Sequence, residues 1–237
     1  MKIAVLKERR ADERRVAATP ETVKKFVGLG VEVTVEAGAG AAAHFPDDDF
    51  QAAGATIAAG PAATLSGADV ILKVRRPIMA DEDGENELAA MSKGQALIAM
   101  LNPLIRRADC EAYAQAGIDA YAMELMPRIS RAQSMDVLSS QANLAGYKSV
   151  LDATEEYGRA MPMMMTAAGT IAPAKVFVMG AGVAGLQAIA TARRLGAVVS
   201  ATDVRPVAKE QVQSLGANFV MVEDEESAQA ETEAGYA

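Results

Sequence analysis

A glycine-rich turn and an aspartate in the last third of the sequence have the residue types and spacing needed to bind a dinucleotide. The segment Gly180-Ala-Gly-Val-Ala-Gly185 matches the pattern G-x-G-x-x-G, and Asp203 follows Gly182 by 21 positions. In such a turn Gly180 permits the sharp reversal, Gly182 lets the backbone approach a pyrophosphate, and Gly185 lets the next helix pack closely on the preceding strand. The spacing therefore predicts a nucleotide-binding turn between a strand and a helix.

The residues at the end of the following strand specify which dinucleotide is expected. Asp203 should accept hydrogen bonds from the adenosine ribose hydroxyls, and its charge would repel a 2′-phosphate. NAD(H) is therefore predicted rather than NADP(H), with Val204 and Arg205 beside the ribose. An arginine next to a surface turn is expected to be solvated, although Arg205 could weaken the discrimination. The helix beginning at Val183 would offer N–H groups to the phosphates; the alternative is a Rossmann-like domain without a cofactor.

A polar loop farther upstream offers a second set of candidate residues. Residues 127–134 follow the end of a predicted strand, and loops beyond the carboxyl ends of strands are where α/β sheets bind ligands. The side chains expected to project toward a cleft between domains are Arg128, Arg131, Gln133, Asp136 and Ser139. From the residues alone, a plain helix-capping loop is an equally good interpretation.

Several other reactive residues are expected to be structural. Lys73 should form an ion pair or extend its stem along apolar surface, and His44, the only histidine, should be a loop residue. The methionine cluster at residues 161–165 is expected to serve packing. Cys110 stands alone, which excludes a disulfide within the chain. No metal site is predicted.

Alternating strand and helix patterns in the first 140 residues predict a parallel sheet covered on both faces. Thr19, Pro20 and Glu21 offer an N-cap, a first-turn proline and an acidic first turn for one of these helices. Strands are expected over residues 3–6, 32–35, 70–74, 96–101 and 118–123, and helices over 19–29, 48–53, 85–93 and 103–116.

A second alternating region follows a long helix expected over residues 135–159. Its strands are expected over 175–179, 198–202 and 218–222, and its helices over 183–195 and 206–215. A complete doubly wound dinucleotide domain has about six strands, so this chain is expected to be a fragment of a longer protein. The predicted fold is α/β, with two Rossmann-like doubly wound parallel-sheet domains, the second incomplete. Residues 1–140 form the first domain, 141–164 a connecting helix and linker, and 165–237 the truncated NAD-binding domain.

The composition excludes several functional classes. The 237 residues, 51% hydrophobic and 23% charged, are typical of a soluble globular protein. A net charge of −8 argues against a nucleic-acid partner. The chain starts on a strand pattern rather than a signal peptide, and no apolar run approaches the ~20 residues that span a bilayer. Membrane association is therefore expected only through a partner, and the lone cysteine fits a reducing compartment.

Four segments resemble a known family. They are PRISRAQSMD at residues 127–136, SSQANLAGY at 139–147, MTAAG at 165–169 and ATDVRP at 201–206. These strings closely resemble the NAD(H)-binding domain I of proton-translocating nicotinamide nucleotide transhydrogenase, and the resemblance runs along the whole chain.

The resemblance implies an activity and partners. In that family, domain I dimerises and docks against an NADP(H)-binding domain at a proton-conducting membrane part, and hydride passes directly between the two nicotinamides. The resemblance thus implies an oxidoreductase component, a homodimer, and a cytoplasmic location at the inner membrane through partner subunits.

The resemblance also implies roles for individual residues. Arg128, Asp136 and Ser139 would hold the nicotinamide end of NAD(H), while Gln133 would reach toward the partner nucleotide. Arg128, Gln133 and Asp136 are accordingly the predicted catalytic residues. Tyr236 matches the tyrosine of the family's mobile loop, which closes over bound nucleotide.

Alanine dehydrogenase is the nearest alternative, because it is similar over the same two-domain layout, including Arg15 and Lys73. Oxidising an amino acid through an imine requires acid/base groups. Where alanine dehydrogenases have a histidine after the next strand, this sequence has Asn102, which cannot shuttle a proton. Transfer between two nicotinamides needs only positioning and water exclusion, so it is the favoured interpretation. A non-catalytic NAD-binding module is a third alternative.

Overall fold

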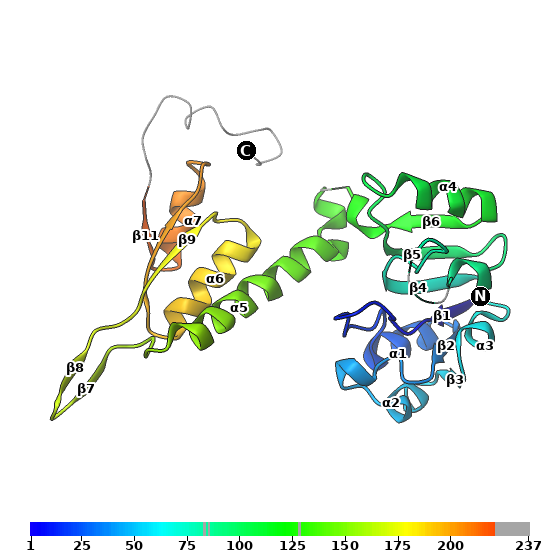
Figure 1. Ribbon diagram of the computed structural model, residues 1–237, viewed down its shortest axis with the longest axis horizontal. Coiled ribbons are helices and arrows are strands. Elements are labelled where there is room, and N and C mark those ends of the chain that lie inside the picture. The colour runs from blue at the N-terminus through cyan, green and yellow to red at the C-terminus, as the bar shows by residue number, and fades with distance from the viewer. Residues whose placement is uncertain (83, 85, 128, 221–237) are drawn as a thin grey trace. The chain divides into compact units, whose positions relative to one another are not determined.

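The structure, a computed structural model, describes residues 1–220 apart from residues 83, 85 and 128. The chain divides into two compact units, Met1–Asp136 and Val137–Ala237 (Figure 1). Each unit has its own parallel sheet, whose strands are connected by helices. The predicted α/β class with two parallel-sheet regions is therefore confirmed.

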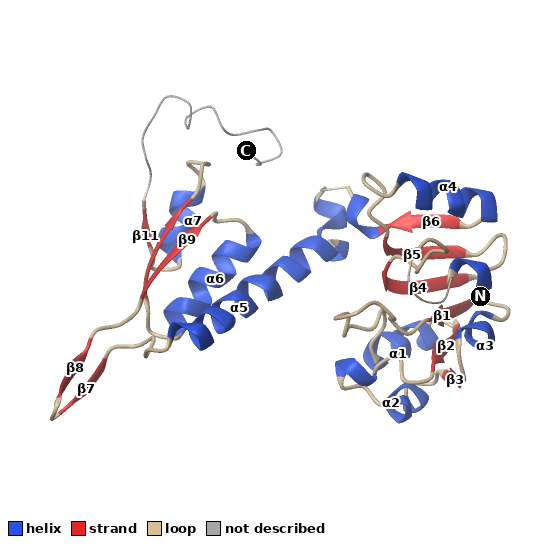
Figure 2. Cartoon of the chain, viewed as in Figure 1, coloured by secondary structure: helices blue, strands red, loops and turns tan. Residues whose placement is uncertain are grey.

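The first unit is built on a six-stranded parallel sheet with the order β3-β2-β1-β4-β5-β6 (Figure 2). Its strands are β1 (Lys2–Val5), β2 (Glu32–Glu36), β3 (Thr56–Ala58), β4 (Val70–Arg75), β5 (Ala96–Met100) and β6 (Asp119–Ala122). Its helices are α1 (Pro20–Gly28), α2 (Asp47–Ala52), α3 (Pro61–Leu65) and α4 (Arg107–Ala116). Short 3-10 turns are η1 (Ala41–Ala43), η2 (Leu88–Ala90), η3 (Met123–Leu125) and η4 (Ser130–Met135).

Both faces of this sheet are buried, as the alternation along β1 shows. Ile3 and Val5 belong to an apolar cluster that includes Phe50 of α2, whereas Ala4 belongs to a different cluster that includes Tyr113 of α4. Successive side chains of a strand point to opposite faces. The sheet is thus covered on both sides, as the near-continuous apolar strands predicted.

Three local features of the first unit differ from the sequence prediction. Strand β3 and helix α3 were not predicted, because each is too short to give a clear period. Of the helix expected over residues 85–93, the described residues form only the turn η2, so that prediction was wrong. The buried Glu87 carboxylate accepts a hydrogen bond from the Ile78 N–H at 2.7 Å, and this long-range contact holds the segment in a turn.

The second unit contains the long helix α5 (Val137–Tyr157) and a three-stranded parallel sheet with the order β11-β10-β9. The elements of the sheet region are β9 (Lys175–Met179), α6 (Val183–Arg194), β10 (Val198–Thr202), α7 (Ala208–Ser214) and β11 (Asn218–Phe219). The predicted elements of this region are all present. The order is that of one mononucleotide half of a doubly wound sheet, with its first strand at an edge.

Helices α5 and α6 pack against each other with very little space between them. A Cβ atom added at Gly146 of α5 would lie 2.0 Å from the carbonyl oxygen of Ala184 in α6. The Asn143 amide of α5 also donates a hydrogen bond to Gln187 of α6 at 3.2 Å. Glycine at position 146 therefore sets how closely the helix covers the nucleotide-binding half.

An antiparallel hairpin, β7 (Met164–Thr166) and β8 (Gly169–Ile171), was not predicted. Met161, just before it, is buried in the core of the second unit, which confirms the packing prediction at that position. Met164 and Met165 of the hairpin, by contrast, are exposed. Among the described residues, no helix is both long and apolar enough to cross a membrane.

Candidate functional site

The turn between β9 and α6 has the geometry that its three glycines predict. Gly180 has φ +94°, a left-handed conformation that favours glycine. A Cβ atom at Gly185 would lie 1.8 Å from the carbonyl oxygen of Gly180, whereas one at Gly182 would meet nothing within 4 Å. Gly180 and Gly185 are thus required by the fold itself, while the Gly182 position leaves open space above the turn.

The start of α6 lies directly behind that open space. Gly182 is the N-cap residue of α6, no side chain caps it, and Val183 opens the helix with no acidic residue in the first turn. The first N–H groups of a helix lack partners within the helix and carry part of the helix dipole. This end of α6 can accept an anionic group such as a phosphate.

Asp203, which follows β10, lies at the same turn. One carboxylate oxygen accepts a hydrogen bond from the Ala181 N–H at 2.6 Å. The other accepts hydrogen bonds at 2.9 Å from the backbone N–H and from Nε of Arg205. Sequence reasoning missed the Ala181 contact, although the position of Ala181 inside the G-x-G motif could have suggested it.

The expectation that Arg205 is solvated was wrong. Its guanidinium forms an ion pair with Asp203, and the two side chains are 18% and 6% exposed. Burial by itself would raise the pKa of Asp203, but the hydrogen bonds from Arg205 and from the Ala181 N–H outweigh it and lower the pKa to about 2. Val204, between the two, has an exposed side chain.

The polar loop supplies the other predicted site residues. Gln133 is exposed in the turn η4, and the half-buried Asp136 ends that turn as the last residue of the first unit. Ser139 lies in the first turn of α5, in the second unit. The second unit thus brings together the glycine turn, Asp203 and Arg205, while Gln133 and Asp136 belong to the first unit. Arg128 and Tyr236 lie outside the described residues.

Lys73 takes part in a buried charge network at the carboxyl end of β1 and β4. Its Nζ lies 2.9 Å from Glu87 Oε1 and 3.6 Å from Glu8 Oε2, and these three side chains are at most 3% exposed. Arg9 extends the network, lying 3.3 Å from Glu87 and pairing with Glu36. The predicted structural ion pair of Lys73 is confirmed. Burial raises the pKa of Glu8, although the charge of Lys73 opposes that shift.

The other residues weighed from the sequence lie in loops of the first unit. His44 is exposed and follows η1 with φ +62°, so its assignment as a loop residue is confirmed. Asn102 follows β5, and its N–H donates a hydrogen bond to the Glu124 carboxylate. Arg15 forms an ion pair with Glu13 at 2.7 Å. In the described part of the chain, no three His, Cys, Asp or Glu side chains are grouped to hold a metal ion.

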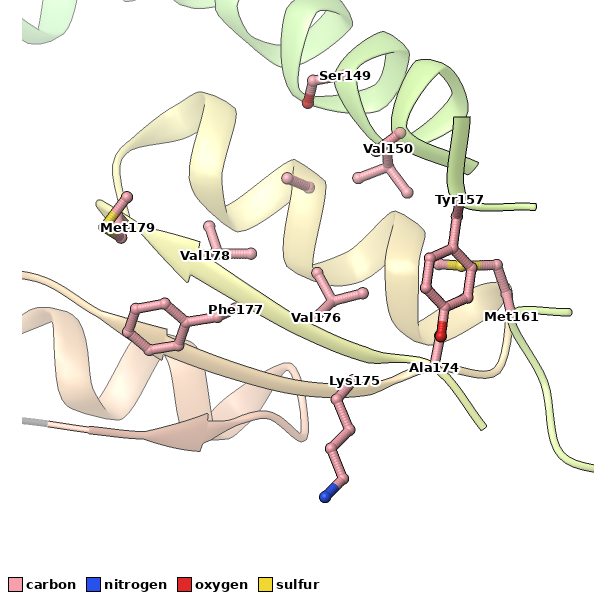
Figure 3. A pocket seen from close by; sticks show the side chains of 12 residues that line it. Ser149, Val150, Tyr157, Met161, Ala174, Lys175, Val176, Phe177, Val178 and Met179 are labelled. Atoms are coloured by element: carbon pink, nitrogen blue, oxygen red, sulfur yellow. The ribbon is translucent and has the colours of Figure 1, made fainter. Parts of the chain in front are cut away.

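An apolar cavity of about 430 Å³ lies between α5 and β9 in the second unit (Figure 3). Val150 and Tyr157 of α5 line one side, and Val176 and Val178 of β9 line the other. None of the predicted site residues lines this cavity. The glycine turn, rather than the cavity, carries the groups suited to a charged nucleotide, so the cavity is not assigned to the cofactor.

Comparison with known proteins gives two consecutive family matches. Residues 4–145 match the alanine dehydrogenase/PNT N-terminal domain, and residues 149–236 match the alanine dehydrogenase/PNT C-terminal domain. A relative from Rhodospirillum rubrum, the first of the chains that make up its NAD(P) transhydrogenase subunit alpha, is 61% identical over all 237 residues. The chain spans 62% of that relative's length.

Solved structures give the same result. A transhydrogenase from Sinorhizobium meliloti superimposes with a TM-score of 0.90 at 57% identity, covering 97% of this chain and 64% of that one. An L-alanine dehydrogenase superimposes with a TM-score of 0.81 at 27% identity, covering 98% of this chain and 62% of that one. With both of its domain models matched in order along the sequence, the chain belongs to the alanine dehydrogenase/PNT family.

Proposed function

We propose that this chain is the NAD(H)-binding component of a proton-translocating transhydrogenase, in which hydride passes directly between NADH on this chain and NADP⁺ on a partner domain. The observation that carries the proposal is the open glycine turn beside the Asp203 carboxylate. A relative with 61% identity is named as a transhydrogenase subunit, which supports the choice of reaction.

The residues at the turn fit NAD(H). The space above Gly182, which a Cβ atom would enter freely, can receive the pyrophosphate against the N–H groups of α6. Asp203 stands at the end of the next strand, where its carboxylate can accept hydrogen bonds from the ribose hydroxyls. Val183, Val204 and Arg205 complete the proposed binding residues.

The polar loop is proposed to handle the nicotinamide. Arg128, Asp136 and Ser139 hold that end of the cofactor, and Gln133, whose side chain is exposed, reaches toward the partner nucleotide. Tyr236 closes over the bound nucleotide. Bound NADH supplies a hydride from C4 of its nicotinamide, so this chain's task is to fix the ring and exclude water.

The acid/base inventory favours this reaction over amino-acid oxidation. The only histidine, His44, is in a loop after η1, and Asn102 carries no titratable proton. Lys73 is already paired with two buried carboxylates. The proposed partners are therefore an NADP(H)-binding domain and a membrane domain, with the chain acting as a homodimer on the cytoplasmic side of the inner membrane.

The test is hydride transfer from NADH to an NADP⁺ analogue, measured with this chain and a purified NADP(H)-binding domain of a transhydrogenase. A full-length relative is the positive control, because this chain spans 62% of such a relative. Turnover should require both proteins. Gln133→Ala should lower turnover without weakening NADH binding, whereas Ser134→Ala, at a neighbouring exposed residue, should leave turnover unchanged.

Two other outcomes would replace the proposal. The structural likeness to an L-alanine dehydrogenase makes NADH-dependent reduction of pyruvate with ammonium the competing reaction. If that reaction proceeds and hydride transfer does not, the chain is an amino-acid dehydrogenase. If NADH binds and neither reaction proceeds even with the partner domain, the chain is a non-catalytic NAD-binding module.

A further inference from the structure

Arg205 lies at the corner of the proposed site where the adenosine ribose would sit, next to the carboxylate of Asp203. Nε and Nη2 of Arg205 donate to the two carboxylate oxygens at 2.9 and 3.2 Å, and the backbone N–H of the same residue donates at 2.9 Å. A cation is therefore held where a 2′-phosphate of NADP(H) would arrive.

The electrostatic effect of this cation depends on its neighbour. A guanidinium pairs well with phosphate through two parallel hydrogen bonds. Here the same donors face a carboxylate whose side chain is only 6% exposed, so little of the pair's attraction is lost to solvent. An incoming 2′-phosphate would have to displace Asp203 from Arg205 and would leave two anions side by side.

We propose that Asp203 and Arg205 form a coenzyme-selectivity pair, in which Asp203 excludes the 2′-phosphate partly by occupying the arginine that would otherwise bind it. This inference rests on the proposed NAD(H) site and adds a latent ligand to it. NAD(H) selectivity is then a property of the pair, because Arg205 favours the 2′-phosphate as soon as the carboxylate charge is removed.

Neutral variants of nearly the same shape separate the two contributions. Asp203→Asn keeps an oxygen that can accept the hydrogen bond from the Ala181 N–H but loses the charge that holds the guanidinium. Arg205→Gln removes the cation and leaves the carboxylate. The double variant removes both, so it tells whether any gain in NADPH binding comes from the freed arginine or only from the lost repulsion.

The experiment measures dissociation constants by calorimetry for NADH, NADPH, AMP and adenosine 2′,5′-bisphosphate with the four proteins. The last two ligands isolate the 2′-phosphate from the rest of the cofactor. Asp203→Asn should bind NADPH and the bisphosphate roughly tenfold to a hundredfold more tightly than wild type, the range of one charge-assisted hydrogen bond. In the double variant most of that gain should disappear, and Arg205→Gln alone should show none.

Several results would overturn the proposal. If the double variant binds NADPH as tightly as Asp203→Asn, Arg205 is not the latent ligand. If Asp203→Asn gains no affinity for the bisphosphate while wild type binds NADH, the pair does not set selectivity although the NAD(H) site stands. If wild type binds neither NADH nor AMP, the proposed function itself fails. Asp203→Ser serves as a second neutral variant should the asparagine protein not fold, with thermal unfolding as the check.

Discussion

The glycine turn makes a sharp prediction, because two of its glycines should fail in different ways when each is replaced by alanine. A methyl group at position 185 would lie 1.8 Å from the carbonyl oxygen of Gly180 and 2.8 Å from its carbonyl carbon. Ordinary van der Waals contact needs about 3.5 Å, so α6 and the turn would have to separate by roughly 1.5 Å. Both contacts are backbone atoms, which no change of rotamer can move away.

The expected cost follows from that overlap. Overpacking costs about 1–3 kcal/mol and sometimes more, and a clash with backbone atoms belongs at the upper end. A loss of about 3 kcal/mol lowers the melting temperature of a unit this size by roughly 12–24 °C. Gly182→Ala should behave differently, since its methyl group would meet nothing within 4 Å and its φ of −74° suits alanine. Its stability should stay within about 1 kcal/mol of wild type.

Binding should reverse the order of the two variants. At a temperature where both are folded, Gly182→Ala should weaken NADH binding by roughly tenfold or more, because its methyl group occupies the space proposed for the pyrophosphate. The assays are scanning calorimetry for stability and fluorescence titration for NADH. If Gly182→Ala melts as early as Gly185→Ala, or binds NADH like wild type, the division of labour between the two glycines is wrong.

Three further outcomes are expected. The pKa of Asp203 is lowered from 3.8 to about 2, so its carboxylate stabilises the fold above about pH 4, and on the order of 2 kcal/mol is lost as the pH falls from about 4 to 2. Asp203→Asn should flatten this acid step in denaturant titrations followed by circular dichroism, and an unchanged profile would contradict the pairing. Lys73→Met should cost about 3–5 kcal/mol at neutral pH, since it leaves buried carboxylates unpaired. That loss should shrink as the pH is lowered, because the pKa of Glu8, already raised by burial, rises further without the ammonium; equal losses at pH 5 and 8 would refute this. Gly146→Ala should lower the melting temperature of the second unit, because its Cβ atom would lie 2.0 Å from the Ala184 carbonyl oxygen, and an unchanged calorimetric transition would refute that close packing.

Much of the fold could be predicted because the signals are local. The central strands of the first unit and the strand–turn–helix at Gly180 show clear periods and glycine spacings that need no knowledge of the rest of the chain. The separate roles of Gly180 and Gly185 also followed from backbone geometry alone.

The remainder depended on contacts between distant residues or on side-chain choices. Glu87 holds a turn where the local pattern predicted a helix, because its carboxylate is bonded to Ile78 and Lys73. Arg205 could have pointed to solvent by every local rule, and only the position of Asp203 beside it explains why it does not. Strand β3 and the β7–β8 hairpin are only three residues per strand, too short for periodicity to be seen.

The buried network around Lys73 has a consequence for how this sequence can vary. Its members come from separate stretches of chain, with Glu8 and Arg9 after β1, Glu36 at the end of β2, and Lys73 and Glu87 farther on. A single neutral replacement strands a charge in the interior, so descendants that lose one member should soon lose or exchange its counter-ion. Among homologues these positions are expected to covary as a group, leaving a signature of paired replacements that reports the contact without any structure.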